Sequence, residues 1–267
     1  MNKRAFTLIE LLVVIAIVGI LSSVIYTNIT GLRDRAKITA GIRFDSSLLH
    51  SIGDQLIGEW MFDTNTNPTP DTSGSGYNGT ISGATYATTS GYNNKGTYNF
   101  DGNDYITISS PIVGGLNSAT MCMWINPTYK NDTAYNAPGG LTGTSNRASF
   151  SLLIQASNNR MFFYANTSVG YSSTGDSEQV IYDTWQHFCG VYDGSKLYLY
   201  KNGVNVNSGA QSGTIESSGI FRIGSWGLGN FFKGYIDDVR IYSSALSGSE
   251  IQKLYVKGAT SHISSLK

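Results

Sequence analysis

One stretch near the start of the chain limits what the whole protein can be. From Phe6 to Ile25 the sequence runs for 20 residues with a single charged side chain, Glu10. A helix rises about 1.5 Å per residue, so this stretch would span about 30 Å, the thickness of the hydrocarbon core of a membrane. Lys3 and Arg4 come just before it, and basic residues at that position favour a cytoplasmic N-terminus. We therefore expect the bulk of the chain to lie outside the cytoplasm.

Three interpretations of this stretch compete. A secretory signal peptide also has a basic start and an apolar segment, but it ends at a small-residue cleavage site, for which Ser22-Ser23 is only a weak candidate. A plain membrane anchor has no need of Glu10, because a carboxylate in hydrocarbon is costly and requires a partner. The third interpretation depends on the order of the residues around Glu10.

The segment from Lys3 to Val14, KRAFTLIELLVV, resembles the prepilin signal of type IV pilins and type II secretion pseudopilins. The resemblance implies that a prepilin peptidase cleaves between Ala5 and Phe6 and methylates the new amine of Phe6. Many family members have glycine at the cut, where this chain has Ala5. We expect Glu10 of one subunit to neutralise the Phe6 amine of a neighbour, which would remove two unpaired charges from a filament core.

The apolar stretch continues into an amphipathic pattern. Over residues 27–52, apolar side chains recur at near-helical spacing with charged side chains between them, and Gly53 is a plausible stop. We predict a leader over residues 1–5 and a helix over residues 6–53, of which residues 6–26 form the membrane or filament core.

From Gly58 the chain changes to short alternating segments separated by glycine and asparagine turns. Ala119–Pro127 alternates around a tryptophan, Phe150–Ile154 and Met161–Ala165 read as a hairpin, and Lys196–Lys201 is followed by the hairpin turn Asn202-Gly203. A helical pattern returns only near residue 247. Regular short strands over about 200 residues predict an antiparallel sandwich or barrel.

Several blocks of this region resemble a laminin G-like domain of the concanavalin A-like jelly-roll superfamily. In chain order they are Gly58–Asp63, Asp71–Thr80, Phe100–Gly102, Trp185–His187, Tyr192–Gly203, Gly234–Tyr242 and Ala245–Ser247. The resemblance implies a mostly β protein, an antiparallel two-sheet jelly-roll sandwich preceded by a long N-terminal hydrophobic helix. We place this domain at residues 58–256, followed by a C-terminal tail at 257–267, and expect it to bind carbohydrate or protein.

Many laminin G-like domains bind calcium, and calcium prefers several hard oxygen ligands. The loop from Asp71 to Asn78 is rich in such groups, and other aspartates could approach it in the folded head; our candidate ligands are Asp63, Asp71, Asn78, Asp101, Asp237 and Asp238. The alternative, that these residues only shape turns through local hydrogen bonds, stays open.

Aromatic residues in loop-like stretches could form a platform for a sugar. Trp226 lies in a glycine-rich segment and is our candidate ligand-binding residue, although a packing role is favoured for it; Tyr129, Tyr135 and Tyr171 lie in similar stretches. We expect the other tryptophans to lie on strands in the core.

Cys122 and Cys189 both fall on predicted strands. They could form a disulfide if their Cα atoms came within about 7 Å, but we expect two separate buried thiols.

Catalysis is not expected. Glycosidases need two carboxylates aimed at one sugar, and none of the five glutamates begins a Glu-x-Asp-x-x-Glu pattern. Asp237 and Asp238 are adjacent on a predicted strand and should point to opposite faces. A net charge of zero gives no argument for nucleic acid as a partner.

The leading hypothesis is a type IV pilus-like filament subunit that displays the laminin G-like head for adhesion to a surface glycan or protein. Its expected partners are prepilin peptidase, other pilin subunits and the membrane before assembly, with the head finally on an extracellular filament or the cell surface. A type II secretion pseudopilin is the alternative, and a membrane-anchored carbohydrate-active enzyme is a third reading.

Overall fold

The computed structural model describes residues 52–129, 135–142, 148–216, 219–227 and 229–265, together with Leu12. Contacts divide the chain into two compact units, Met1–Ser51 and Ile52–Lys267. The second unit, which we call the head, holds its own sheets and hydrophobic core, so we treat it as able to fold alone. Ile52 and Gly53 are helical and precede the first strand. Nearly all of the apolar stretch lies outside the described residues, and among the residues that are described no helix is long and apolar enough to cross a membrane.

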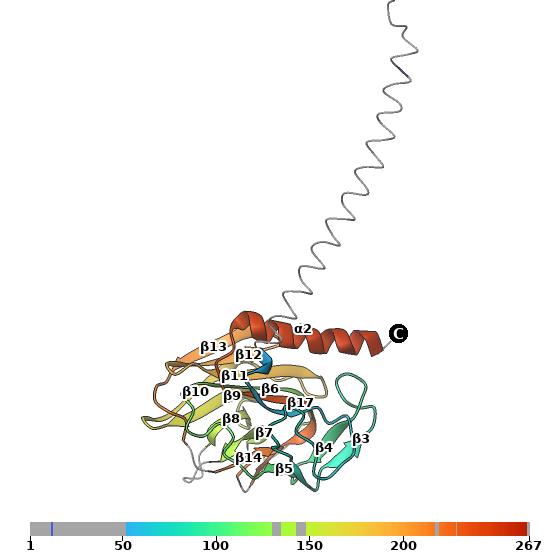
Figure 1. Ribbon diagram of the computed structural model, residues 1–267, viewed down its shortest axis with the longest axis horizontal. Coiled ribbons are helices and arrows are strands. Elements are labelled where there is room, and N and C mark those ends of the chain that lie inside the picture. Colours follow the sequence, from blue (N-terminus) through green and yellow to red (C-terminus); the bar gives the residue numbers. More distant parts are fainter. Residues whose placement is uncertain are drawn as a thin grey trace, which may run out of the picture. The chain divides into compact units, whose positions relative to one another are not determined.

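The head is a sandwich of two antiparallel sheets (Figure 1). Sheet I has the strand order β13 (Val204–Ala210), β12 (Lys196–Lys201), β11 (Gln186–Tyr192), β6 (Ala119–Pro127), β17 (Lys233–Tyr242), β4 (Thr97–Asp101), β3 (Thr85–Ala87), and β1 (Leu56–Trp60) also pairs with β17. Sheet II has the order β10 (Gly170–Gln179), β9 (Arg160–Thr167), β8 (Ala148–Gln155), β7 (Asn136–Thr142), β14 (Ile220–Ile223), β5 (Tyr105–Ile108), β2 (Thr80–Ser82). A small ribbon pairs β15 (Ser225–Trp226) with β16 (Asn230–Phe231).

The strand predictions are confirmed where alternation and turn residues agree. Strand β6 has the predicted bounds, β8 and β9 form the predicted hairpin, and the turn after β12 uses Asn202 and Gly203 with φ of 51° and 80°. Positive φ at both central residues is what a tight hairpin turn needs, and asparagine followed by glycine tolerates it best.

The core lies between the sheets and follows the alternation of side chains along each strand. On β6, Met121 and Met123 point inward; on β9, Phe163 does. A Cβ on Gly190 of β11 would overlap the ring of Phe163, so glycine at this position lets the two sheets approach. The two opposite faces of the sheets are left to be covered or exposed.

Helix α2 (Gly248–Ser265) covers part of the outer face of sheet I (Figure 1). A capping box starts it, since the Ser247 backbone N–H donates to Glu250 at 2.6 Å and the Glu250 N–H donates to the Ser247 hydroxyl at 3.4 Å. Ile251 and Leu254 pack beneath it with outward side chains of the sheet. The helix continues to Ser265, past residue 256, which is the predicted end of the domain.

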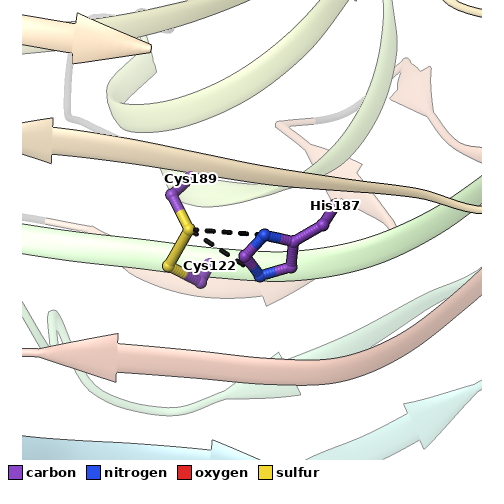
Figure 2. Close-up of side chains that lie close together, drawn as sticks. All are labelled: Cys122, His187 and Cys189. Atoms are coloured by element: carbon purple, nitrogen blue, oxygen red, sulfur yellow. Dashed lines mark hydrogen bonds between the residues drawn. A yellow bond between two sulfur atoms is a disulfide. The ribbon is translucent and has the colours of Figure 1, made fainter. Parts of the chain in front are cut away.

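The two cysteines form a disulfide, so the expectation of separate thiols is wrong. Cys122 of β6 and Cys189 of β11 are direct partners in the ladder between those strands, with Cα atoms 4.2 Å apart and an S–S bond of 2.09 Å (Figure 2). The sequence placed both on strands but could not show that these strands are neighbours. Sheet order therefore decides the pairing.

Candidate functional site

The residues of the predicted processing and assembly site, Ala5, Phe6 and Glu10, lie outside the described part of the chain. The structure therefore bears on the head, where two regions gather polar or aromatic side chains. One is the outer face of sheet II, and the other is a gap in sheet I.

The outer face of sheet II carries a connected group of aromatic rings, which we call the aromatic face: Tyr135, Phe162, Tyr164, Tyr171 and Trp226. The ring centroids of Tyr171 and Tyr164 lie 5.4 Å apart, those of Tyr164 and Tyr135 6.4 Å apart, and those of Tyr135 and Trp226 6.1 Å apart. Ala137 and Leu153 lie beneath the group. The rings thus form a continuous series from β10 across to β15.

Alternation on β9 explains why this face is aromatic. Met161 and Phe163 fill the core, so Phe162 and Tyr164 necessarily point to the other side. Tyr164 is 6% exposed. Burial raises the pKa of its phenol, and the neighbouring tyrosines raise it further. Tyr171 is 43% exposed and is the most accessible ring of the series. The aromatic face is therefore anchored by buried rings and accessible at Tyr171.

Trp226 is the predicted platform residue, but its ring is half-buried against Tyr135. Its indole Nε1 is buried without a hydrogen-bond partner. Packing is thus a large part of its role, and the ligand-binding role remains a prediction. Tyr135 and Tyr171, named with it from the sequence, do come together with it, whereas Tyr129 packs on Tyr182 instead.

A polar cavity adjoins the aromatic face. It has a volume of about 340 Å³ and is lined by Gly115, Asn166, Thr167, Ser168, Thr214, Ile215 and Glu216. One oxygen of Glu216 accepts hydrogen bonds from Asn166 at 2.7 Å and from Ser149 at 2.9 Å. Asn166 is the ladder partner of Tyr171, which places the exposed ring beside the cavity. Aromatic rings next to amide, hydroxyl and carboxylate groups can bind a polyhydroxylated ligand through stacking and hydrogen bonds.

The second region is a gap along one edge of β17. Strand β4 pairs with the first part of β17 and β1 with the last part, and the ladder shifts register between Asp237 and Arg240. Asp238 has a φ of 51°, which marks a β-bulge. The bulge places Asp237, Asp238 and Arg240 on the lining of one pocket, so the expectation that the two aspartates point to opposite faces is wrong.

The Asp237 side chain makes hydrogen bonds at the point where neither β4 nor β1 pairs with β17. Its two oxygens accept the backbone N–H groups of Tyr92 and Asp238, each at 2.9 Å. Burial raises the pKa of Asp237 well above 3.8, and the nearby charge of Asp238 adds to the effect.

Arg240 holds two carboxylates on the same side of the gap. Its Nε donates to Glu59 at 2.9 Å and its Nη1 to Asp238 at 2.6 Å. Burial raises the pKa of Asp238, while the Arg240 charge lowers it. The guanidinium therefore ties β1, the first strand of the head, to β17, its last strand.

Comparison with protein-family models shows which superfamily has this architecture. A family model described as the concanavalin A-like lectin/glucanases superfamily matches residues 100–252, more than half of the chain. The chain belongs to this superfamily. A second model, the prokaryotic N-terminal methylation motif, matches residues 1–26, which confirms the prepilin-type resemblance of that segment. No curated protein matches the chain.

Solved structures share the fold of this concanavalin A-like head. Domain 4 of AbnA, a GH43 extracellular arabinanase from Geobacillus stearothermophilus solved with arabinotriose, is 22% identical, with a TM-score of 0.60, over 75% of this chain and 98% of that domain. The binding domain of Paraclostridial Mosquitocidal Protein 1 is 15% identical, with a TM-score of 0.62, over 76% of this chain and 52% of that one. The botulinum neurotoxin serotype D binding domain is 16% identical, with a TM-score of 0.60, over 78% and 52%. The match spans about half of each toxin domain, and the likeness is one of fold.

The candidate calcium ligands are engaged in hydrogen bonds and ion pairs within the concanavalin A-like head. Asp71 accepts the N–H groups of Glu59, Ser73 and Tyr77, and Asn78 accepts the N–H of Asp71, so both shape their own loop. These bonds outweigh burial and lower the pKa of Asp71.

The remaining candidates are occupied in other ways. Asp63 pairs with Lys95 at 2.9 Å, Asp101 accepts the N–H of Asn103, and the two aspartates of β17 contact backbone or Arg240. The described residues hold no group of three or more carboxylates with the spacing of a metal site. They do not fit the ion as placed, and a calcium site stays a prediction.

Phe162, Tyr164, Glu216 and the Arg240 network were not predicted from the sequence. A signal for the first two was present, since a strand with large apolar residues at both sets of alternating positions must present rings on both faces. No local signal marks Glu216 or the Glu59–Arg240 contact, because their partners lie far away in the chain.

Proposed function

We propose that this protein is a subunit of a type IV pilus-like filament and that its concanavalin A-like head binds a saccharide at the aromatic face. The observation that carries the binding proposal is the exposed Tyr171 ring beside a polar cavity, supported by the rings of Tyr164 and Tyr135. The methylation motif supports export as a membrane-anchored precursor, with the head outside the cell.

We propose binding rather than catalysis for this head. The carboxylates of the gap in sheet I are engaged by Arg240 or backbone N–H groups, and Glu216 accepts hydrogen bonds from two neighbouring side chains. A glycosidase would need one carboxyl group as acid and another as base or nucleophile across a sugar.

Tyr171→Ala is expected to weaken saccharide binding by the isolated head by roughly 30-fold, because truncation of a central interface residue costs about 2 kcal/mol. A glycan array with residues 52–267 would find the ligand, and titration calorimetry would compare the variants. Tyr129→Ala is the matched control, since Tyr129 is 54% exposed and its ring packs on Tyr182, which is not one of the rings of this face. A wild-type head that binds nothing on the array, or equal loss in both variants, would refute the site.

Glu10→Ala is expected to abolish filament assembly while the head folds normally, because the Phe6 amine of a neighbouring subunit would lose its counter-charge in an apolar core. Filaments sheared from cells expressing the variant can be imaged and identified by mass spectrometry. Glu178→Ala removes a carboxylate that is 80% exposed on the head and should leave assembly unchanged. Normal filaments from the Glu10 variant would contradict the charge-pairing mechanism. Short or trace filaments from wild-type cells would favour a pseudopilin.

A further inference from the structure

An arginine stands at one end of the aromatic face. Arg160 begins β9, two residues before Phe162 and four before Tyr164, so alternation places its side chain on the same outward face as both rings. The Arg160 side chain is exposed to solvent. The saccharide site described above uses the rings and the cavity near the other end of β9, and it makes no use of this charge.

Strand β9 sets out the aromatic face in a line. Its outward side chains are, in chain order, Arg160, Phe162, Tyr164 and Asn166. At a rise of about 3.3 Å per residue, about 20 Å separates Arg160 from Asn166. The ring centroids of Phe162 and Tyr164 lie 5.9 Å apart between these two ends. The line is therefore long enough for several sugar units.

The two ends of this line differ in charge. Asn166 adjoins the cavity that holds Glu216, and its amide donates to that carboxylate at 2.7 Å. Arg160, at the other end, is a permanent cation. A ligand that carries an anionic group is therefore favoured with this group at Arg160 and away from Glu216.

The acidic side chains near Arg160 are paired with another cation. Gln179 of β10 is the ladder partner of Arg160, and two carboxylates come shortly before it in the chain. These are Asp176 and Glu178, which lie 3.2 Å and 3.7 Å from the Lys201 ammonium. No ion pair among the described residues includes Arg160. The guanidinium is thus available to a ligand.

Amide side chains flank the arginine on both neighbouring strands. Arg160 is the ladder partner of Gln155 on β8 and of Gln179 on β10. An amide can donate to a sugar oxygen or accept from a sugar hydroxyl beside the charged group. Opposite Phe162, β10 has Gly175, so no side chain from that position covers the ring. A guanidinium, two amides and a half-buried ring thus lie together at this end.

We propose that the aromatic face selects acidic oligosaccharides and that a carboxylate of the ligand pairs with Arg160. This inference rests on the proposed saccharide binding, to which it adds the class of ligand and its direction on β9. The guanidinium presents a fork of N–H donors that matches the two oxygens of a carboxylate, and such hydrogen bonds are charge-assisted. The sugar units that follow contact the rings toward Tyr171, where a second carboxylate would meet the like charge of Glu216.

The test uses residues 52–267 on an array that carries oligogalacturonate, oligoalginate, hyaluronan and sialyllactose, each beside its carboxyl methyl ester, together with neutral oligosaccharides. The ester keeps the sugar and removes the charge. At least one acid is expected to bind about tenfold more tightly than its ester, which is the effect of one charge-assisted hydrogen-bonded pair. The preference should shrink in 1 M salt, where the Debye length falls to about 3 Å.

The outcomes separate this inference from the function on which it rests. Binding of neutral sugars alone, or of each ester as tightly as its acid, would leave the saccharide function standing and overturn the acidic preference. A head that binds nothing on the array would overturn both.

Variants assign the preference to one side chain. Arg160→Met should lower the affinity for the acid about tenfold, to that of the ester, and leave ester binding unchanged. Arg160→Lys keeps the charge without the fork and should fall between the two. Lys196→Met is the matched control, since it removes an exposed cation from β12 of the other sheet and should change neither affinity. Equal loss for acid and ester in Arg160→Met, or an equal loss in the Lys196 variant, would overturn the assignment.

Discussion

Arg240→Met is expected to lower the free energy of unfolding of the head by about 3–5 kcal/mol, because it leaves buried carboxylates without their cation. The Arg240 side chain is 11% exposed, and its partners Glu59 and Asp238 are 19% and 12% exposed. Loss of the guanidinium also removes the contact that ties β1 to β17. Chemical denaturation of residues 52–267, followed by fluorescence, measures the effect.

The loss should depend on pH in a definite direction. Without Arg240, the pKa of Asp238 rises further above the ordinary value of 3.8, since the Arg240 charge is what lowers it. A carboxyl group whose pKa is higher in the folded state than in the unfolded state stabilises the fold at low pH. This stabilisation is lost as the pH rises through the folded-state pKa. The deficit of the variant is therefore expected to be smaller near pH 4 than near pH 7.

Lys95→Met is the matched control, because it also removes a cation that pairs with a carboxylate. Lys95 is 61% exposed, so the change should stay below about 1 kcal/mol. Removing all three buried charges together, by Glu59→Gln, Asp238→Asn and Arg240→Met, should cost less than removing Arg240 alone. Equal stability of Arg240→Met and wild type at neutral pH would show that the network does not stabilise the head.

Replacing both cysteines by alanine is expected to lower the free energy of unfolding by about 4 kcal/mol in the absence of reductant. The cysteines are 67 residues apart, and the loop that their disulfide closes restricts the unfolded chain to about that extent on the chain-entropy model. The loop contains β7 to β10, and therefore most of the strands that form the aromatic face. Loss of the disulfide should thus affect the stability of the whole sandwich.

A reductant provides the control for this prediction. It should destabilise wild type by a similar amount and leave the alanine variant unchanged. A thiol reagent applied to the denatured, unreduced head should find no free thiol. Two reactive thiols in that assay would show that the disulfide does not form, and the variant would then be expected to lose only packing at two small side chains.

The sequence by itself determined the class of each part of the chain. The segment around Glu10 is a linear motif, so order and spacing within a few residues suffice to recognise it, and the family model matches the same region. The strands of the head were predictable because alternation and turn residues such as Asn202-Gly203 act over a few neighbouring positions. The start of α2 was predictable for the same reason, since Ser247 and Glu250 form their capping box locally.

Only the tertiary structure decided which of these residues meet. The disulfide between Cys122 and Cys189 follows from β6 and β11 being neighbours, and the aromatic face follows from β9, β10 and β15 lying on one side of the sandwich. The bulge at Asp238 turned two aspartates toward one pocket, against the strict alternation that the sequence predicted. Local patterns fix secondary structure, because their interactions are short in sequence. Sheet order and bulges depend on contacts between distant segments, and those contacts assemble both the aromatic face and the disulfide.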